Sequence, residues 1–218
     1  MSLWAILPVK EMEGSKQRLS PLLSPAERVA LMRVMVAEVL DALCVARGLA
    51  GMSVVTLDAW AAAEARRRGA RVITKGAREG HTGSVTAAAR VLAAEGATGV
   101  LTVPGDVPAV TAAEVEALAA AHGPAPAFTI APAHDEKGSN GVVLSPPGVV
   151  PLRFGDDSYF PHLAAARARG LEPRVVRLPG LAMDIDHPAD VAMFARLDVA
   201  RGTRTLAWLR EAGILSGL

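Results

Sequence analysis

Two aspartates separated by one residue, Asp184 and Asp186, are the pair of side chains in this sequence that most clearly suggests a functional site. In an extended segment, side chains at positions i and i+2 point the same way, and their Cα atoms lie about 6–7 Å apart. Both carboxylates can then bind one hard cation or bridge two. The apolar neighbours predict a partly buried pair, whose charge a cation would offset. Alternatively, Asp186 caps the helix that begins at Pro188, which would leave Asp184 unexplained.

Asp106 is a third candidate carboxylate. It follows an apolar run at 99–103 and stands between Pro104-Gly105 and Val107-Pro108. Prolines restrict the backbone, and a stiff loop suits a carboxylate that must point at a metal ion. A turn residue or a helix cap is the alternative interpretation.

Three cationic residues, Lys10, Lys16 and Arg18, lie within nine residues after the first apolar run. At the end of a strand they could bind a triphosphate, assisted by backbone amides. The segment lacks both the Gly-Lys-Ser/Thr ending of a P-loop and the Gly-x-Gly-x-x-Gly dinucleotide turn. A solvated basic loop is the alternative.

Two short glycine-containing segments, 137–140 and 154–158, combine small residues with hydroxyl or amide donors. Each permits close approach of a ligand, although most such segments are simple turns. The five histidines show no metal-ligand spacing, which disfavours a zinc site built from them: His81, His122, His134, His162 and His187.

The elements that must position these residues follow an α/β pattern, in which short apolar runs alternate with Ala-rich helical segments. The pattern predicts a mostly parallel sheet flanked by helices, with ligands bound at the carboxyl ends of the strands. Predicted strands cover 4–9, 52–57, 71–74, 99–103, 127–131, 141–144 and 174–178. Predicted helices begin at Ser24 and Thr111, each with a capping box, and cover 58–68, 84–94, 157–169, 188–199 and 203–214.

Composition limits the class of protein. The 218 residues are 51% hydrophobic and 21% charged, which predicts one folded domain over 1–218, with 203–218 as a C-terminal helical extension. The formal net charge of +1 disfavours a nucleic-acid partner. The single cysteine, Cys44, excludes an intramolecular disulfide and is expected to be a small buried hydrophobe on the first helix. No apolar run reaches membrane-spanning length and no signal peptide is evident, so we expect a cytoplasmic protein without a membrane partner.

Taken in order, these motifs resemble the guanylyltransferases of coenzyme F-420 biosynthesis. Those enzymes are relatives of the molybdenum-cofactor nucleotidyltransferases and have a glycosyltransferase-A-like fold, also described as nucleotide-diphospho-sugar transferase-like. The resembling stretches span most of the chain: Leu7–Lys10, Lys16–Arg28, Pro104–Pro108, Gly138–Asn140, Phe154–Ser158 with His162, and Leu181–Asp186 with Pro188.

The resemblance implies a reaction and a role for each candidate. Family members join GTP to 2-phospho-L-lactate, phosphoenolpyruvate or 3-phospho-D-glycerate and release pyrophosphate. One or two Mg²⁺ ions would bind Asp106, Asp184 and Asp186. Lys10, Lys16, Arg18 and Asp106 would be catalytic. The GTP contacts would be Pro8, Lys10, Lys16, Gly83 and Ser84, with Arg18 on the same side, and the acceptor contacts would be Ser139, Asn140, Gly155 and Ser158.

Two departures from the family pattern leave the specificity open. Gly80-His81-Thr82-Gly83-Ser84-Val85 stands where a Gly-x-Leu-Asn segment is usual, and Lys137-Gly138-Ser139-Asn140 stands where Gly-Gly-Thr-Asn is usual. The first concerns the nucleobase and the second the acceptor. The alternatives are another nucleotidyltransferase of this fold, acting on a molybdopterin or sugar phosphate, and a non-catalytic nucleotide-binding module. The missing glycine fingerprint disfavours a dinucleotide-dependent oxidoreductase.

Overall fold

A seven-stranded sheet forms the centre of the computed structural model, which describes residues 1–155 and 157–217. The strand order is β3-β2-β1-β4-β6-β5-β7, and in it β6 alone runs antiparallel to its neighbours, so the predicted mostly parallel sheet is confirmed. The strands are β1 (Leu3–Pro8), β2 (Gly51–Val55), β3 (Arg71–Ile73), β4 (Gly99–Thr102), β5 (Ala127–Pro132), β6 (Ser139–Ser145) and β7 (Arg174–Val175).

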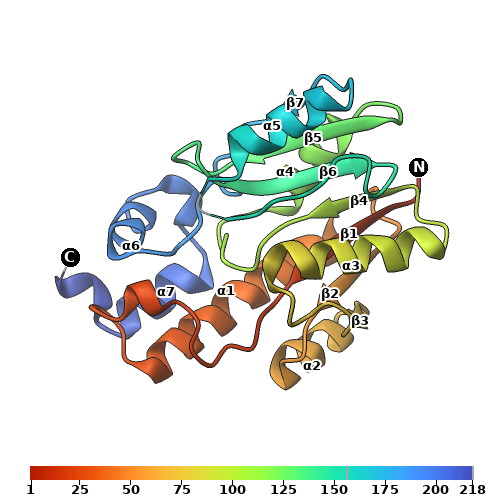
Figure 1. Ribbon diagram of the computed structural model, residues 1–218. Helices are drawn as coiled ribbons and strands as arrows, with labels where there is room; N and C mark the ends of the chain where they lie inside the picture. Colours follow the sequence, from red (N-terminus) through yellow and green to blue (C-terminus); the bar gives the residue numbers. More distant parts are fainter. Residues whose placement is uncertain (156, 218) are drawn as a thin grey trace.

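Helices cover both faces of this sheet (Figure 1). Side chains of alternating strand residues divide the core: Ala5 and Leu7 pack with α1, α2 and α4, whereas Ile6 packs with α3 and α5. The helices are α1 (Pro25–Val45), α2 (Ala59–Arg67), α3 (Gly80–Ala94), α4 (Ala112–Ala120), α5 (Tyr159–Ala168), α6 (Pro188–Phe194) and α7 (Arg204–Glu211). Both predicted capping boxes are present, at Ser24 and Thr111.

A third apolar cluster lies beside the sheet and binds the C-terminal part of the chain to the body. Leu31 and Met35 of α1 pack with Phe194 of α6 and with Leu206 and Leu209 of α7. The helix predicted for 203–214 is therefore present, over Arg204–Glu211, and it is packed against α1. Leu218, the last residue of the predicted extension, lies outside the described residues.

Several boundaries differ from the predicted ones. The edge strand β7 keeps only Arg174–Val175, because it pairs with β5 at two positions, and α6 ends at Phe194. Helix α3 begins at Gly80, a turn earlier than predicted. The expectation that Cys44 is buried is wrong. Cys44 is exposed on the last turn of α1, where its thiol lies 3.6 Å from the Arg68 carbonyl oxygen.

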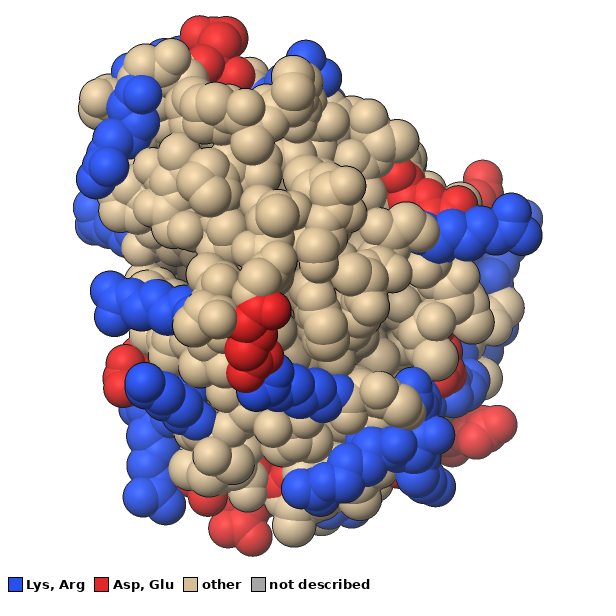
Figure 2. Space-filling view, turned by 90° about the vertical axis from the view of Figure 1, so that its right-hand side faces the viewer, with Lys and Arg blue, Asp and Glu red and all other residues tan. Residues whose placement is uncertain are grey.

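The side of the molecule that carries the N-terminus (Figure 2) shows a broad area without charged side chains. Around it, the same face carries both basic and acidic side chains. Among the residues that the structure describes, no helix is long and apolar enough to cross a membrane.

Candidate active site

A cavity of about 1120 Å³ opens at the edge of the sheet where β1 and β4 end and the antiparallel β6 begins. Its walls come from the loops after β1 and β4, the first turn of α3, the start of β6, the loop before α5 and the segment before α6. The volume is ample for a nucleotide together with a small acid. The predicted convergence of the candidate residues at one edge is therefore confirmed for most of them.

In the segment that carries Asp184 and Asp186, apolar and acidic side chains point alternately to opposite sides, as in an extended strand. Met183 and Ile185 are buried in the third apolar cluster, whereas both aspartates line the cavity. The amide of Ile185 donates a hydrogen bond to the Asp106 carbonyl oxygen at 3.1 Å, so the two acidic loops are joined. The helix behind them begins after His187, and Asp190 accepts hydrogen bonds from the Asp186 and His187 amides. The Asp186 carboxylate is thus free of a capping role.

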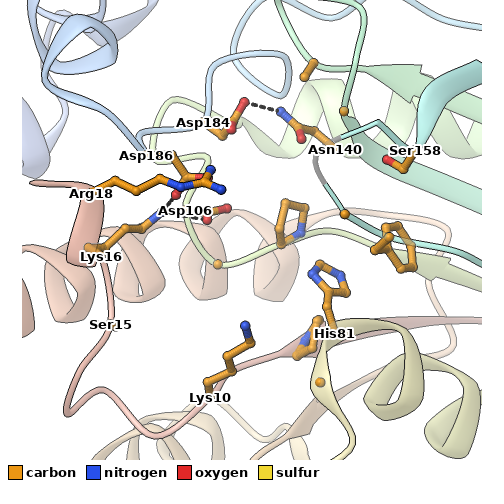
Figure 3. A pocket seen from close by; sticks show the side chains of 18 of the residues that line it. Lys10, Ser15, Lys16, Arg18, His81, Asp106, Asn140, Ser158, Asp184 and Asp186 are labelled. Carbon is orange, nitrogen blue, oxygen red and sulfur yellow. Dashed lines mark hydrogen bonds and ion pairs between the residues drawn. The ribbon is translucent and has the colours of Figure 1, made fainter.

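Lys16 reaches into this acidic group (Figure 3). Its backbone adopts a left-handed conformation (φ 52°), which is uncommon for a residue other than glycine. Its ammonium lies 2.7 Å from Asp106 Oδ2 and 2.5 Å from Asp186 Oδ1, and its side chain is only 5% exposed. Burial lowers the pKa of Lys16, but the two carboxylates outweigh burial and hold the pKa above its usual value. The residue is a cation held among acids, not part of a solvated basic loop.

Asp184 is the carboxylate with excess negative charge around it. Its Oδ1 accepts a hydrogen bond from the Asn140 amide at 2.9 Å. Burial, and after it the nearby Asp106 and Asp186, raises the pKa of Asp184 to about 6, although the Asn140 hydrogen bond acts in the other direction. By contrast, the Lys16 ammonium outweighs burial at Asp106 and holds the pKa of that carboxyl below its usual value. The Lys16 ammonium thus pairs with Asp106 and Asp186, whereas Asp184 has no such contact with it.

This excess of negative charge is what a divalent cation would offset, and carboxylate and amide oxygens suit Mg²⁺. In the described part of the chain, no group of three or more Asp, Glu, His or Cys side chains has an arrangement that could hold a metal ion by itself. The Lys16 ammonium already lies between Asp106 and Asp186. Mg²⁺ in nucleotide-dependent enzymes is commonly held by one or two carboxylates, substrate phosphates and water. The residues present fit that kind of site.

We expect Asp184→Asn to raise the melting temperature of the metal-free protein at pH 7.5. The folded-state pKa lies near 6, above the value of about 3.9 in an unfolded chain, so ionisation of Asp184 favours unfolding. The stability that the protonated carboxyl contributes is present below pH ~4 and is lost as the pH rises through 6. The gain at pH 7.5 should be roughly 1–3 kcal/mol. Melting curves in EDTA at pH 4 and 7.5 test this, and a gain of equal size at both pH values would contradict it.

The remaining basic residues lie on the cavity wall. Lys10 is exposed and stands with His81 on the side facing the acidic group (Figure 3). Pro8, the last residue of β1, also lines the cavity. The Arg18 guanidinium lies beside the acidic group, 3.4 Å from His187 Nε2. Lys10 and Arg18 are therefore placed to meet a polyanion in the cavity.

Gly83 and Ser84, the predicted GTP contacts, are not among the residues that line the cavity. Since α3 begins at Gly80, both lie inside the helix; the Ser84 hydroxyl donates to the Gly76 carbonyl oxygen at 3.0 Å. Gly80, His81 and Thr82 line the cavity instead of Gly83 and Ser84.

Reasoning from the sequence missed His81 as a cavity residue. Its ring stacks on Phe154 with centroids 4.3 Å apart, and its buried Nε2 has no hydrogen-bond partner within the described ranges. Burial lowers the pKa of His81 to about 4, so the ring is neutral at pH 7. The departure of residues 80–85 from the family pattern was the feature of the sequence that could have pointed to His81.

The predicted acceptor contacts come together on the wall next to Asp184. Ser139, Asn140, Gly155 and Ser158 all line the cavity. Ser139 lies 3.0 Å from His162 Nδ1, and the hydroxyl of Ser158 lies 3.1 Å from that of Ser139. Asp156, in the middle of the 154–158 motif, lies outside the described residues.

Comparison with known proteins decides the family. The family model described as "Guanylyl transferase CofC like" matches residues 3–215. The chain belongs to the CofC-like guanylyltransferase family. A phosphoenolpyruvate guanylyltransferase from Rubrobacter xylanophilus is 37% identical over 94% of this chain and 97% of that protein. A 2-phospho-L-lactate guanylyltransferase from Methanothermobacter thermautotrophicus is 33% identical over 97% and 91%, and a 3-phospho-D-glycerate guanylyltransferase from Colwellia psychrerythraea is 31% identical over 88% and 90%.

Solved structures confirm the fold of this CofC-like protein. A Desulfovibrio desulfuricans protein for which a nucleotide-diphospho-sugar transferase activity has been suggested superposes with a TM-score of 0.78 at 20% identity, covering 99% of this chain and 97% of that one. A nucleotidyl transferase from Methanothermobacter gives a TM-score of 0.61 at 19% identity, with 96% and 99% covered. The fold class predicted from the sequence is therefore correct.

Proposed function

We propose that this protein transfers the guanylyl group of GTP to a small phosphorylated three-carbon acid and releases pyrophosphate, as a step of coenzyme F-420 biosynthesis. Phosphoenolpyruvate is the first acceptor to test, because several relatives that match most of the chain are named for it. 3-Phospho-D-glycerate and 2-phospho-L-lactate come next, from the names of other relatives.

The observation that carries this proposal is the meeting of three carboxylates and the Lys16 ammonium beside a basic wall, within a cavity of nucleotide size. One or two of the carboxylates of Asp106, Asp184 and Asp186 would hold Mg²⁺ together with the triphosphate, and the ion would supply charge neutralisation at the α-phosphate and the departing pyrophosphate. Lys10 and Arg18 face the triphosphate from the wall. Lys16 keeps the acidic group intact and adds positive charge next to the reacting phosphorus.

The acceptor would lie along Ser139, Asn140 and Ser158. Its phosphate oxygen attacks the α-phosphorus of GTP, the bond to the β-phosphate oxygen breaks, and pyrophosphate leaves with the electron pair. A phosphate monoester has its second pKa near ~6, so the attacking group is mostly a dianion at pH 7.5. The reaction therefore needs no proton removal by the protein.

We therefore expect His162→Gln and His187→Gln to keep kcat, at saturating acceptor, within about tenfold of the wild type. Removal of a true general base costs about 10²–10⁴-fold. In the structure, both ring nitrogens of His162 already have partners, and His187 lies against Arg18. Steady-state pyrophosphate release measures the effect. A thousandfold loss in either variant, with GTP binding retained, would point to a hydroxyl acceptor and refute the phospho-acid proposal.

Melting curves with nucleotides give a direct test of the nucleotide and metal. GTP, ATP, CTP and UTP are each added with and without Mg²⁺, since a ligand that binds the folded state raises its melting temperature. Stabilisation by GTP that depends on Mg²⁺ supports the proposal. Preference for another nucleotide, or stabilisation that EDTA leaves unchanged, contradicts it.

A further inference from the structure

A hydrogen-bond chain runs from the backbone of Arg153 to the cavity wall. The Arg153 amide donates to His162 Nε2 at 2.9 Å, and His162 Nδ1 lies 3.0 Å from Ser139 Oγ. Ser139 Oγ in turn lies 3.1 Å from Ser158 Oγ. His162 is fully buried, whereas both serines line the cavity. The chain therefore links a fixed backbone donor to the candidate acceptor site.

The positions of the protons in this chain follow from the Arg153 amide. A backbone N–H can only donate, so His162 Nε2 must accept and carries no proton. In the neutral ring the proton is then on Nδ1, which donates to Ser139 Oγ. Burial lowers the pKa of His162 to about 4, and the nearby His81 acts in the same direction, in keeping with a neutral ring at pH 7.

One hydroxyl proton is left over. The two serines carry two such protons, and the hydrogen bond between them uses one, whichever serine donates it. Ser139 Oγ and Ser158 Oγ make no other hydrogen bond within the part of the chain that the structure describes. The remaining O–H is therefore available to a ligand in the cavity. A hydroxyl that donates there would bind a carboxylate or phosphate oxygen and not an ammonium.

The His162 ring has little freedom to turn away from this arrangement. Phe154 packs against it edge to face with centroids 5.2 Å apart, and Phe128 lies on another side at 6.2 Å. Reversal of the ring would also remove the partner of the Arg153 amide.

We propose that His162 is a positioning residue of the acceptor site: its Nδ1–H fixes the Ser139–Ser158 pair so that one hydroxyl proton is donated to an oxyanion of the phosphorylated acid. This inference rests on the proposed function for the identity of the acceptor. The hydrogen bonds around His162 do not depend on the identity of the acceptor.

The test compares His162→Leu, which removes the donor, with His162→Asn, whose amide can donate near the position of Nδ1. We expect His162→Leu to raise the KM for phosphoenolpyruvate at least tenfold while the KM for GTP changes less than twofold. His162→Asn should recover the acceptor KM to within about threefold. Equal effects of the two variants, or equal rises in both KM values, would overturn the proposal.

His122 supplies a matched control. Its two ring nitrogens lie 2.9 Å from Thr129 Oγ1 and 2.8 Å from Ser145 Oγ, away from the cavity lining. His122→Leu should change melting temperature without raising the acceptor KM. A rise in acceptor KM that matches that of His162→Leu would mean that general loosening of the fold explains both, and the proposal would fail.

Nitrogen NMR of the ¹⁵N-histidine-labelled wild type separates this proposal from the proposed function. The His162 signals should show the Nδ1–H tautomer at pH 7 and should shift when at least one of phosphoenolpyruvate, 3-phospho-D-glycerate and 2-phospho-L-lactate is added without GTP. An Nε2–H tautomer, an imidazolium or no response to any of the three acids would overturn the proposal. Absence of pyrophosphate release with every phospho-acid would refute the proposed function alone, because the tautomer and the binding shift would still decide the role of His162.

Discussion

Asp106→Asn and Asp184→Asn should each lower turnover by about 10³-fold or more while the protein stays folded. The expected loss corresponds to roughly 4 kcal/mol of transition-state stabilisation, within the several kcal/mol that a bound metal supplies. An asparagine keeps the shape of the side chain and loses the charge that holds the cation. Turnover is measured as pyrophosphate release from GTP over a Mg²⁺ titration, beside circular dichroism and melting curves.

A remote carboxylate provides the control for these variants. Glu172 is exposed and pairs with Arg167 on the surface, so Glu172→Gln should leave turnover unchanged. Full activity of Asp106→Asn or Asp184→Asn at saturating Mg²⁺ would show that the carboxylates do not hold the metal, and the assignment would have to be withdrawn.

Lys16→Ala should produce the second large effect, a loss of about 10²-fold in turnover together with a less stable apo protein. The ammonium contacts both Asp106 and Asp186. Removing one partner of a fully buried ion pair costs about 3–5 kcal/mol, and the cost here should be smaller because solvent reaches Asp106 and Asp186. Mg²⁺ should therefore raise the melting temperature of the variant more than that of the wild type.

Lys10→Ala separates the contribution of a cation to GTP binding from its contribution to the stability of the apo protein. Lys10 is exposed, so its removal should weaken GTP binding while leaving the melting temperature of the apo protein unchanged. If Lys16→Ala changes turnover less than twofold and leaves apo stability intact, the catalytic and stabilising roles given to Lys16 are wrong.

Local patterns in the sequence predicted the parts of the site that depend on local structure. The alternation of apolar and acidic residues from Met183 to Asp186 was visible in the sequence and is what turns both carboxylates toward the cavity. Both capping boxes were visible too, because the Ser24 and Thr111 side chains act on amides three residues away.

Other parts of the site depend on long-range contacts that leave no local signal. Lys16 meets partners 90 and 170 positions further along the chain, so only the folded structure could show that it sits among acids. The start of α3 was placed a turn too late because Glu79 makes no side-chain cap there. Gly83 and Ser84, which the family resemblance implied as GTP contacts, therefore lie inside the helix, and Gly80, His81 and Thr82 line the cavity. The exposure of Cys44 depends on which face of α1 packs at its last turn.

Pyrophosphate release with GTP and a panel of phosphorylated three-carbon acids tests the central claim most directly. The panel contains phosphoenolpyruvate, 3-phospho-D-glycerate and 2-phospho-L-lactate, with glucose 1-phosphate as a sugar-phosphate control, each with Mg²⁺ and with EDTA. The account predicts Mg²⁺-dependent release with GTP and one of the three acids, accompanied by a guanylylated product. Release only with the sugar phosphate, or equal release in EDTA, would contradict it.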